Sequence, residues 1–189
     1  VDEVVSSLPL GILVKSLHPP APEHVLEAVS EIKFRDVLLI MFCLDIESVN
    51  GNASMYFPSK EDPFTRIYEP RNRSKWMAPE GKTSLAVEVP MDPAASKAKN
   101  TDGFIDEVER KLTGYGFFKR SDVIRRHTYM LKNAYPVLTV DHQDHAEVAL
   151  SFLKNLKNLY ITGRNGLVQY SHIHDHMRNA MIWLETREL

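Results

Sequence analysis

The feature that most constrains this chain is a short apolar segment that stops at a glycine and leads, after a polar loop, into an amphipathic helix. Residues 159–162 are apolar and β-prone, and Gly163 ends them. Further along, apolar residues recur with the spacing of one helical face at Met177, Ala180, Met181 and Leu184. The sequence therefore predicts a strand, a glycine turn that carries Arg164, a loop and a helix.

Such a turn is suited to bind a ligand. A helix N-terminus carries partial positive charge and free backbone N–H groups, so it favours an anion or the electron-rich edge of a ring. Gly163 and Gly166 have no Cβ atom and would let the backbone approach a ligand closely. Taken alone, Arg164 would more readily be a surface residue at a strand end, so the residues themselves leave its role open.

The rest of the chain predicts an alternation of strands and helices. Strands are expected at 1–9, 34–44, 55–57, 65–68, 83–89 and 123–131, and helices at 22–31, 102–112 and 141–153. The run 34–44 is the most apolar and predicts a buried central strand. Residues 91–101 are rich in Ala, Lys, Pro and Asn and are expected to be mobile. This pattern predicts a mixed α/β or α+β fold.

Composition argues against several classes of protein. The 189 residues carry a net charge of −2 without a dominant Lys/Arg block, so no nucleic-acid partner is expected. The single cysteine, Cys43, cannot form an intrachain disulfide, which favours a reducing compartment. The apolar run 37–44 is less than half as long as a membrane-spanning helix. These features predict a cytoplasmic protein with no integral membrane span.

The segment 158–167, followed by Tyr170, resembles the C-terminal flavin-contacting segment of FAD-dependent amine oxidoreductases. It is most similar to the protoporphyrinogen-oxidase-like and UDP-galactopyranose-mutase-like flavoproteins. The resemblance also includes residues 4–9, 66–72, 77–79 and 81–85. It implies that the Gly163-Arg164 turn lies along the flavin and that the following helix points its N-terminus at the pyrimidine ring.

The resemblance implies which residues contact the flavin. Residue type and position suggest which side chains contact the substrate. Cofactor contacts are expected at Gly163, Arg164, Asn165, Gly166, His174 and Asp175. Substrate contacts are expected at Tyr56, Tyr68, Arg71, Tyr170 and His172. An arginine in the turn would stabilise negative charge on the reduced isoalloxazine ring. The family spans porphyrinogens, carotenoid-like molecules, amines and nucleotide sugars, and it includes a non-redox mutase, so substrate and reaction type stay open.

Enzymes of this family normally carry a Gly-x-Gly-x-x-Gly turn near their N-terminus, and this sequence contains none. The chain is therefore expected to be the C-terminal part of a longer protein that binds FAD, and to be inactive and free of flavin by itself. Residues 1–10 would be a returning strand of the FAD-binding domain, and residues 11–155 a mixed α/β substrate-binding region with flanking helices. Residues 156–189 would form the FAD-contacting strand, turn and helix. Expected partners are a small-molecule substrate, the missing N-terminal half and, through exposed strand edges, further copies of the chain.

Two other functions remain open. The missing nucleotide-binding turn would also suit a stand-alone ligand-binding or interaction module without chemistry. A more remote alternative is a metal-dependent hydrolase. The cluster of His172, His174, Asp175 and His176 resembles the zinc-binding motif of metallo-β-lactamase-type enzymes but is one residue shorter. A simpler interpretation of the same residues is a polar helix N-terminus, with Asp175 placed favourably near the helix dipole.

Overall fold

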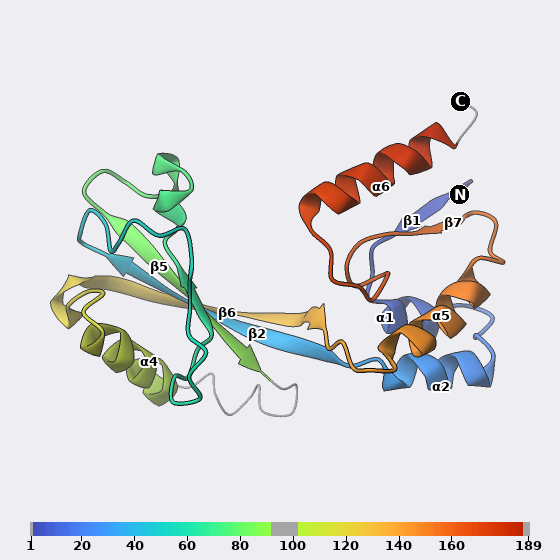
Figure 1. The fold of residues 1–189 in the computed structure, drawn as a ribbon, viewed down its shortest axis with the longest axis horizontal. Helices are drawn as coiled ribbons and strands as arrows, with labels where there is room; N and C mark the ends of the chain where they lie inside the picture. Colours follow the sequence, from blue (N-terminus) through green and yellow to red (C-terminus); the bar gives the residue numbers. More distant parts are fainter. Residues whose placement is uncertain (1, 92–101, 187–189) are drawn as a thin grey trace. The chain divides into compact units, whose positions relative to one another are not determined.

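The computed structural model describes residues 2–91 and 102–186 (Figure 1). Their contacts divide the chain into two compact units. The first unit contains the residues up to Phe34 together with those from Tyr135 onward, and the second contains Arg35–Ala134. The second unit is thus inserted into the sequence of the first. The stretch expected to be mobile lies, apart from Met91, outside the described residues.

The second unit is built on a five-stranded sheet with the strand order β3-β4-β5-β2-β6. Its strands are β2 (Phe34–Leu44), β3 (Met55–Tyr56), β4 (Arg66–Tyr68), β5 (Thr83–Met91) and β6 (Val123–Pro136). The pairs β3–β4, β4–β5 and β5–β2 are antiparallel, and Ile40 of β2 lies opposite Val87 of β5. The run 34–44 was predicted to be a buried central strand, and β2 indeed lies between β5 and β6.

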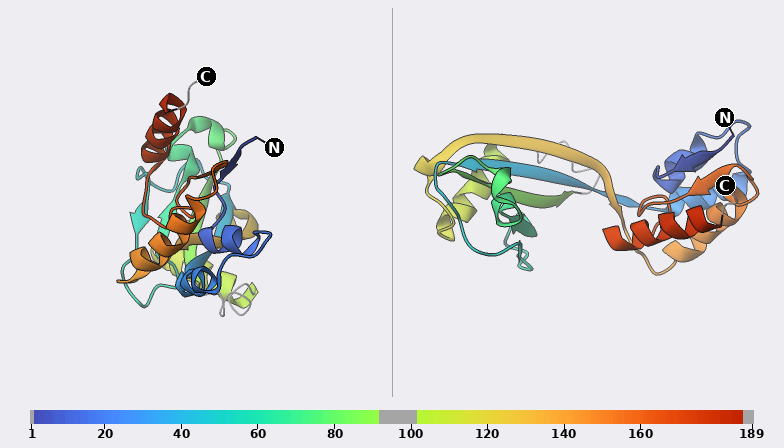
Figure 2. Two further views of the ribbon diagram at one scale, coloured as in Figure 1. Left: turned by 90° about the vertical axis from the view of Figure 1, so that its right-hand side faces the viewer. Right: turned by 90° about the horizontal axis from the view of Figure 1, so that it is seen from above.

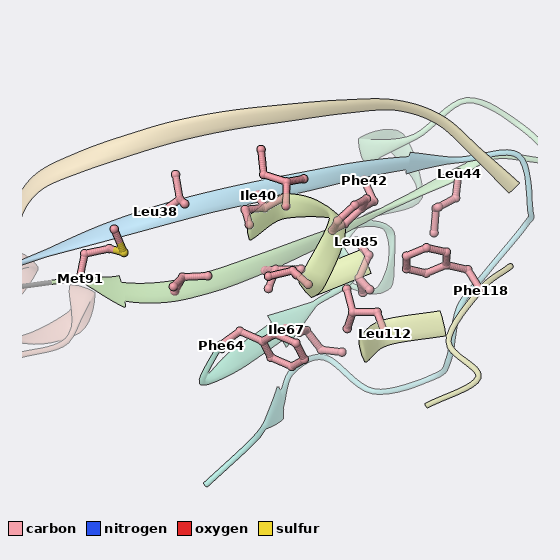
Figure 3. Close-up of a cluster of buried hydrophobic side chains, with 14 residues drawn as sticks. Leu38, Ile40, Phe42, Leu44, Phe64, Ile67, Leu85, Met91, Leu112 and Phe118 are labelled. Carbon is pink, nitrogen blue, oxygen red and sulfur yellow. The ribbon is translucent and has the colours of Figure 1, made fainter. Parts of the chain in front are cut away.

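One face of this sheet is covered by helix α4 (Asp102–Gly114), as Figures 1 and 2 show. Because side chains alternate along a strand, every second residue of β2 points toward α4. The core thus formed is drawn in Figure 3 and includes Leu38, Ile40, Phe42, Leu85, Val87, Val108 and Leu112. The intervening residues of β2, such as Leu39 and Met41, are only half-buried on the other face.

The first unit combines a small sheet with four helices. Within the described residues, β1 (Val4–Ser6) and β7 (Leu159–Ile161) form a two-stranded parallel sheet, with Val4 opposite Leu159. Its helices are α1 (Leu10–Lys15), α2 (Glu23–Glu31), α5 (His142–Leu153) and α6 (Ile173–Glu185). Helices α1, α2 and α5 pack on one another around a second core that includes Leu10, Val14, Val25, Val29, Ala149 and Leu153.

The mixed α/β fold class predicted from the sequence is confirmed, since the chain has a parallel sheet, an antiparallel sheet and flanking helices. Three elements differ from expectation. The first strand is confined to β1, helix α1 was not predicted, and β6 continues to Pro136, five residues beyond the predicted end of that strand. Short 3-10 helices also occur at η1 (Pro70–Asn72), η2 (Lys75–Met77) and η3 (Arg120–Asp122). No helix in the described part of the chain is long and apolar enough to cross a membrane.

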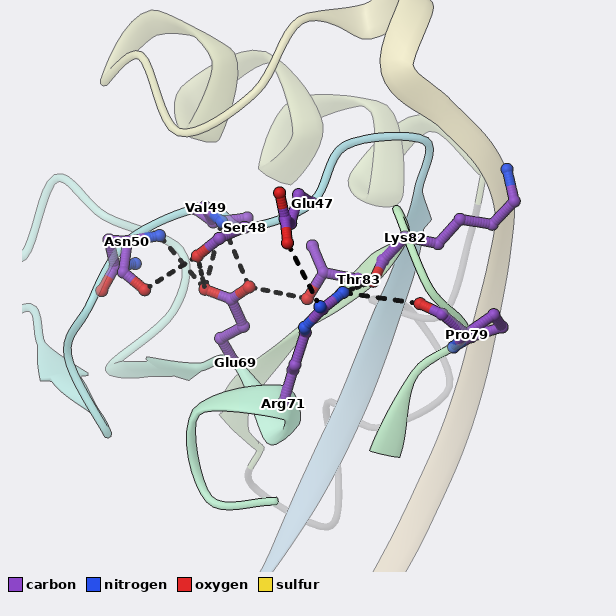
Figure 4. A network of polar contacts seen from close by, with 9 residues as sticks. All are labelled: Glu47, Ser48, Val49, Asn50, Glu69, Arg71, Pro79, Lys82 and Thr83. Atoms are coloured by element: carbon purple, nitrogen blue, oxygen red, sulfur yellow. Dashed lines mark hydrogen bonds and ion pairs between the residues drawn. The ribbon is translucent and has the colours of Figure 1, made fainter. Parts of the chain in front are cut away.

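A buried carboxylate organises one end of the second unit. The side chain of Glu69, next to η1, is almost fully shielded from solvent. It accepts hydrogen bonds from the backbone N–H groups of Val49 and Asn50 and from the side chains of Ser48 and Thr83 (Figure 4). It also accepts one from the side chain of Asn72. One acidic side chain thereby ties the loop after β2 to η1 and to the first residue of β5.

Replacing this carboxylate should destabilise the second unit. In Glu69→Gln the amide nitrogen cannot accept the hydrogen bonds that one carboxylate oxygen now receives, so buried donors lose their partner. We expect a loss of about 2–4 kcal/mol in the free energy of unfolding, measured by urea titration with circular dichroism. Glu80→Gln, which alters an exposed carboxylate, is the control and should change stability by less than about 0.5 kcal/mol. Equal stability of the two variants would contradict this role for Glu69.

A second buried carboxylate joins β2 to β6 close to the boundary of the unit. Asp36 accepts hydrogen bonds from Lys132 Nζ at 2.7 Å and from the backbone N–H of Asn133 at 2.9 Å. Asn133 has a positive φ of 50°, a conformation that asparagine tolerates better than most residues. Burial would raise the pKa of Asp36, but the two hydrogen bonds and the charge of Lys132 outweigh it and hold that pKa below its usual value.

The stabilising effect of Asp36 should therefore depend on pH. Because its pKa is lowered in the folded chain, the ionised form stabilises the fold at neutral pH, and this contribution is lost as the pH falls below about 4. Asp36→Asn should cost ~1–3 kcal/mol at pH 7, and the difference from the native chain should shrink in acid. Urea titrations at several pH values test this, with Glu107→Gln as an exposed control. A difference that grows on acidification would contradict the prediction.

Candidate functional site

The glycine turn after β7 is shaped by the chain's own packing. Gly163 has a φ of +83°, and a Cβ atom there would lie 3.2 Å from Cβ of Ser7. A Cβ atom at Gly166 would lie 2.4 Å from the carbonyl oxygen of Thr162, which real structures do not tolerate. Glycine is therefore required at both positions by neighbouring residues. Close approach of a ligand, the reason inferred from the sequence, is not needed to explain either one.

Backbone hydrogen bonds fasten this turn to the segment after β1. The N–H of Thr162 donates to the carbonyl oxygen of Ser6 at 2.9 Å, and the N–H of Leu10 donates to that of Asn165 at 3.1 Å. Within the turn, the N–H of Leu167 donates to the carbonyl oxygen of Gly163 at 2.9 Å. The backbone of the turn is thus held both by residues 6–10 and by a hydrogen bond within the turn itself.

Val168 is the strained residue of this loop. Its φ is +51°, an unusual value for a β-branched side chain, yet the side chain is buried in the core of the first unit. Burial of the isopropyl group offsets the strain and holds the backbone in place. This conformation sets the direction of the chain between Arg164 and Tyr170.

Arg164 lies over the rings of two tyrosines. Its guanidinium carbon Cζ is 4.8 Å from the ring centroid of Tyr170 and 5.7 Å from that of Tyr135. Its Nε atom is buried, and no hydrogen-bond acceptor for it lies among the described residues. Tyr135 was not identified from the sequence, because a tyrosine before a proline at a strand end carries no pattern that distinguishes a site residue. The arrangement leaves a shielded donor able to bind an anionic or carbonyl oxygen.

A series of exposed rings continues from Tyr170. The rings of Tyr170 and His172 meet edge to face with centroids 5.3 Å apart, and those of His172 and His174 stack at 5.5 Å. All three side chains are exposed. The structure therefore gathers Arg164, Tyr170, His172 and His174, four of the predicted site residues, on one side of the loop.

Asp175 caps helix α6. Its carboxylate oxygen Oδ2 accepts a hydrogen bond from the backbone N–H of His172 at 2.9 Å. That bond, opposed by burial and supported by the nearby His174, holds the pKa of Asp175 below its usual value. The interpretation of these residues as a polar helix N-terminus agrees with this geometry. The carboxylate also supplies part of the negative charge that the N-terminus of α6 favours.

The histidines near α6 do not form a metal site in the described residues, where no three His, Cys, Asp or Glu side chains are placed to hold one ion. His176 Nε2 instead lies 2.9 Å from the hydroxyl of Ser171. His174 is 3.5 Å from the Asp175 carboxylate. The metal-dependent hydrolase alternative gains no support from this arrangement.

Tyr56 and Tyr68, the predicted substrate contacts of the second unit, lie on the sheet face opposite α4, where their rings contact arginine side chains. Arg66 Cζ lies 5.9 Å from the ring centroid of Tyr56 and 5.4 Å from that of Tyr68. Arg73 Cζ lies 5.2 Å from the ring centroid of Tyr68. The hydrogen-bonded ion pair with Glu88 raises the pKa of Arg66 and fixes its side chain. Alternation along β4 places Arg66 beside Tyr68, and the same pattern would have indicated Arg66 from the sequence.

Arg71, predicted to meet the substrate, holds the loop before β5. Its Nη1 atom donates to the carbonyl oxygen of Lys82 at 2.7 Å and to that of Pro79 at 3.4 Å (Figure 4). Its Nη2 atom lies 3.5 Å from the carboxylate of Glu47. These contacts use the Arg71 guanidinium within the protein, as the ion pair with Glu88 uses that of Arg66. Arg73, whose side chain is exposed, is the better candidate for a substrate contact in this unit.

Part of the first unit remains uncovered next to the turn. Val4 and Val5 of β1 are 40% and 53% exposed. Beside β7, an apolar groove of about 220 Å³ is lined by Leu150, Leu153, Leu159, Tyr160, Ile161 and Leu167. Helix α6 carries further exposed apolar side chains, among them Met177 and Met181. Exposed apolar surface of this kind is typical of a site where another polypeptide binds.

No protein-family model and no curated protein matches this sequence. Solved structures do match. A crystal structure of reduced UDP-galactopyranose mutase aligns with a TM-score of 0.73 and 19% identity, over 87% of this chain and 36% of that one. A putative protoporphyrinogen oxidase from Exiguobacterium sp. 255-15 aligns with a TM-score of 0.66 and 15% identity, over 98% of this chain and 42% of that one. The chain shares the fold of these proteins.

An oxidoreductase from Methanosarcina mazei aligns as well, with a TM-score of 0.56 and 14% identity, over 96% of this chain and 43% of that one. The first two matches are the kinds of protein that the sequence resemblance named, so the resemblance is confirmed at the level of the fold. The chain spans about two fifths of the length of these solved structures.

The tight packing at Gly166 allows a direct test of the turn geometry. In Gly166→Ala the new methyl group would overlap the carbonyl oxygen of Thr162, so the turn must shift. We expect a loss of about 1–3 kcal/mol, measured by urea titration. Gly51→Ala is the matched control, because a Cβ atom there meets nothing within 4 Å. If both alanine variants are as stable as the native chain, the turn does not have this conformation.

Proposed function

We propose that this chain supplies the flavin-ring contacts and the substrate-binding region of an FAD-dependent, amine-oxidase-like oxidoreductase. The observation that supports it best is the shielded Arg164 Nε donor in a glycine turn before a helix, within a fold shared with a UDP-galactopyranose mutase and a putative protoporphyrinogen oxidase. In this proposal residues 156–189 contact the flavin, residues 1–10 are a returning strand of the FAD-binding domain, and residues 11–155 bind the substrate.

The residues of the turn fit the ring end of a flavin. Arg164 would donate from Nε to an oxygen or nitrogen at the ring edge, with the backbone of Gly163, Asn165 and Gly166 beneath it. The N-terminus of α6, with His174 and Asp175, would lie near the pyrimidine side. FAD, when bound, supplies the hydride chemistry. The fixed positive charge of Arg164 would stabilise negative charge on the reduced ring.

Two groups of residues are proposed to bind substrate. In the first unit these are Tyr170 and His172, whose exposed rings adjoin Arg164. In the second unit they are Tyr56 and Tyr68, whose rings both contact the guanidinium group of Arg66. Exposed aromatic faces bind flat or apolar groups, and neighbouring guanidinium groups bind anionic ones.

The diphosphate and ribose of FAD require groups that these residues do not provide. Such contacts normally come from a glycine-rich turn and an acidic residue that binds the ribose. We propose that a polypeptide segment outside the 189 residues supplies them and covers the exposed parts of β1, β7 and α6. The chain covers only about two fifths of the solved structures that it resembles, which agrees with this proposal. Without that segment, the same exposed edges would favour self-association.

The cofactor assignment predicts where flavin binds. The purified 189-residue chain should contain no flavin and should not retain added FAD on gel filtration, because only ring contacts remain. The longer protein should be yellow. In that protein Arg164→Ala should slow flavin reduction about tenfold or more with little effect on folding, since loss of one charge-assisted contact costs ~1.4 kcal/mol or more.

Arg125→Ala, which removes an exposed arginine from β6, is the matched control and should leave flavin reduction unchanged. Stoichiometric FAD in the isolated chain would show that the diphosphate contacts lie within it. Flavin reduction that is insensitive to Arg164→Ala would remove Arg164 from the site.

A further inference from the structure

Two tyrosines from distant parts of the sequence contact Arg164. Tyr135 belongs to the end of β6, whereas Tyr170 follows the glycine turn. Both rings lie within cation–π distance of the guanidinium group. Ring faces attract the delocalised cation but offer no acceptor for the Nε–H group. The contacts therefore fix the position of the side chain without using this hydrogen-bond donor.

The two rings differ in how firmly they are held. Tyr135 is half-buried and precedes Pro136, which restricts the backbone of the residue before it to extended conformations. The N–H of Val137, one residue beyond this proline, donates to the carbonyl oxygen of Lys33 at 2.8 Å and fastens the strand end. Tyr170 is 64% exposed, and beside Arg164 its ring meets that of His172 edge to face. Tyr135 is thus the more firmly held of the two rings, and Tyr170 is the more exposed one.

A buried donor without an acceptor is costly and rare in folded proteins. An arginine with free rotation would relieve that cost by turning Nε toward water, as exposed arginines do. Here the cation–π contacts with the two rings oppose such a rotation. The buried Nε–H is therefore kept in a fixed place, which suits an acceptor that arrives from outside the chain.

We propose that Tyr135 is a positioning residue for Arg164: together with Tyr170 it clamps the guanidinium group and keeps the Nε–H group ready for an anionic or carbonyl acceptor. The identity of that acceptor as the ring edge of a flavin rests on the proposed function. The clamp itself depends only on contacts within the first unit.

The clamp can be measured by NMR on the 189-residue chain without flavin. In the native chain, the ring currents of two tyrosines should move the Arg164 Hδ resonances upfield, and exchange of its Hε proton with water should be slow. Tyr135→Phe keeps the ring and should preserve both signals. Tyr135→Leu removes it and should reduce the upfield shift and speed Hε exchange about tenfold.

Tyr129→Leu, which removes an exposed tyrosine elsewhere on β6, is the matched control and should alter neither signal. Circular dichroism reports whether each variant folds. Should Tyr135→Leu not fold, Tyr170→Leu provides the test, because it removes an exposed ring and should also reduce the upfield shift. Arg164 resonances unchanged in a folded Tyr135→Leu variant, or in Tyr170→Leu, would overturn the clamp.

The role toward flavin has a separate readout. In the longer flavin-loaded protein, Tyr135→Leu should shift the flavin reduction potential in the same direction as Arg164→Ala, and Tyr135→Phe should leave it unchanged. A shift caused by Arg164→Ala but not by Tyr135→Leu would overturn the positioning role while the proposed function stands. If neither variant shifts the potential and the NMR signals behave as expected, the clamp stands and the flavin assignment fails.

Discussion

The parallel pairing of β1 with β7 is the contact on which the candidate site depends. It joins the two ends of the described chain, with Val5 opposite Tyr160 and Ser6 opposite Ile161. The hydrogen bonds and close packing that shape the turn come from the turn itself and from residues at the end of β1 and just beyond it. A turn that looks local in the sequence is therefore defined by a segment from the opposite end of the chain. Its geometry persists only while the two strands stay paired.

Two arginines show why contacts, more than residue type, decide a site assignment. Arg71 uses its guanidinium group on two carbonyl oxygens and lies near Glu47, so its charge and donors serve the fold. Arg164 contacts two rings and keeps a shielded donor for which the described chain provides no acceptor. Both side chains looked equally available in the sequence. A guanidinium group becomes a binding element when its surroundings hold it in place without satisfying its donors.

The sequence was sufficient where a regular pattern extends over enough residues. The long apolar run 34–44 and the helical period from Met177 predicted β2 and α6, and Gly163 marked the end of β7. Helix α1 has only six residues, too few for a helical period to appear. Tyr135 and the strained Val168 owe their places to long-range packing, which no local pattern encodes. The strand–turn–helix was thus predictable, whereas the surroundings of Arg164 were not.

The inserted second unit has a consequence for how the chain folds. The first unit consists of two separate segments, so its assembly requires a loop of about one hundred residues to close. The second unit is continuous, and Asp36 binds Lys132 and Asn133 next to its two ends. When that unit forms, it brings the flanking segments together and removes most of the entropic cost of joining them. We therefore expect the second unit to form first and β1–β7 pairing to follow it.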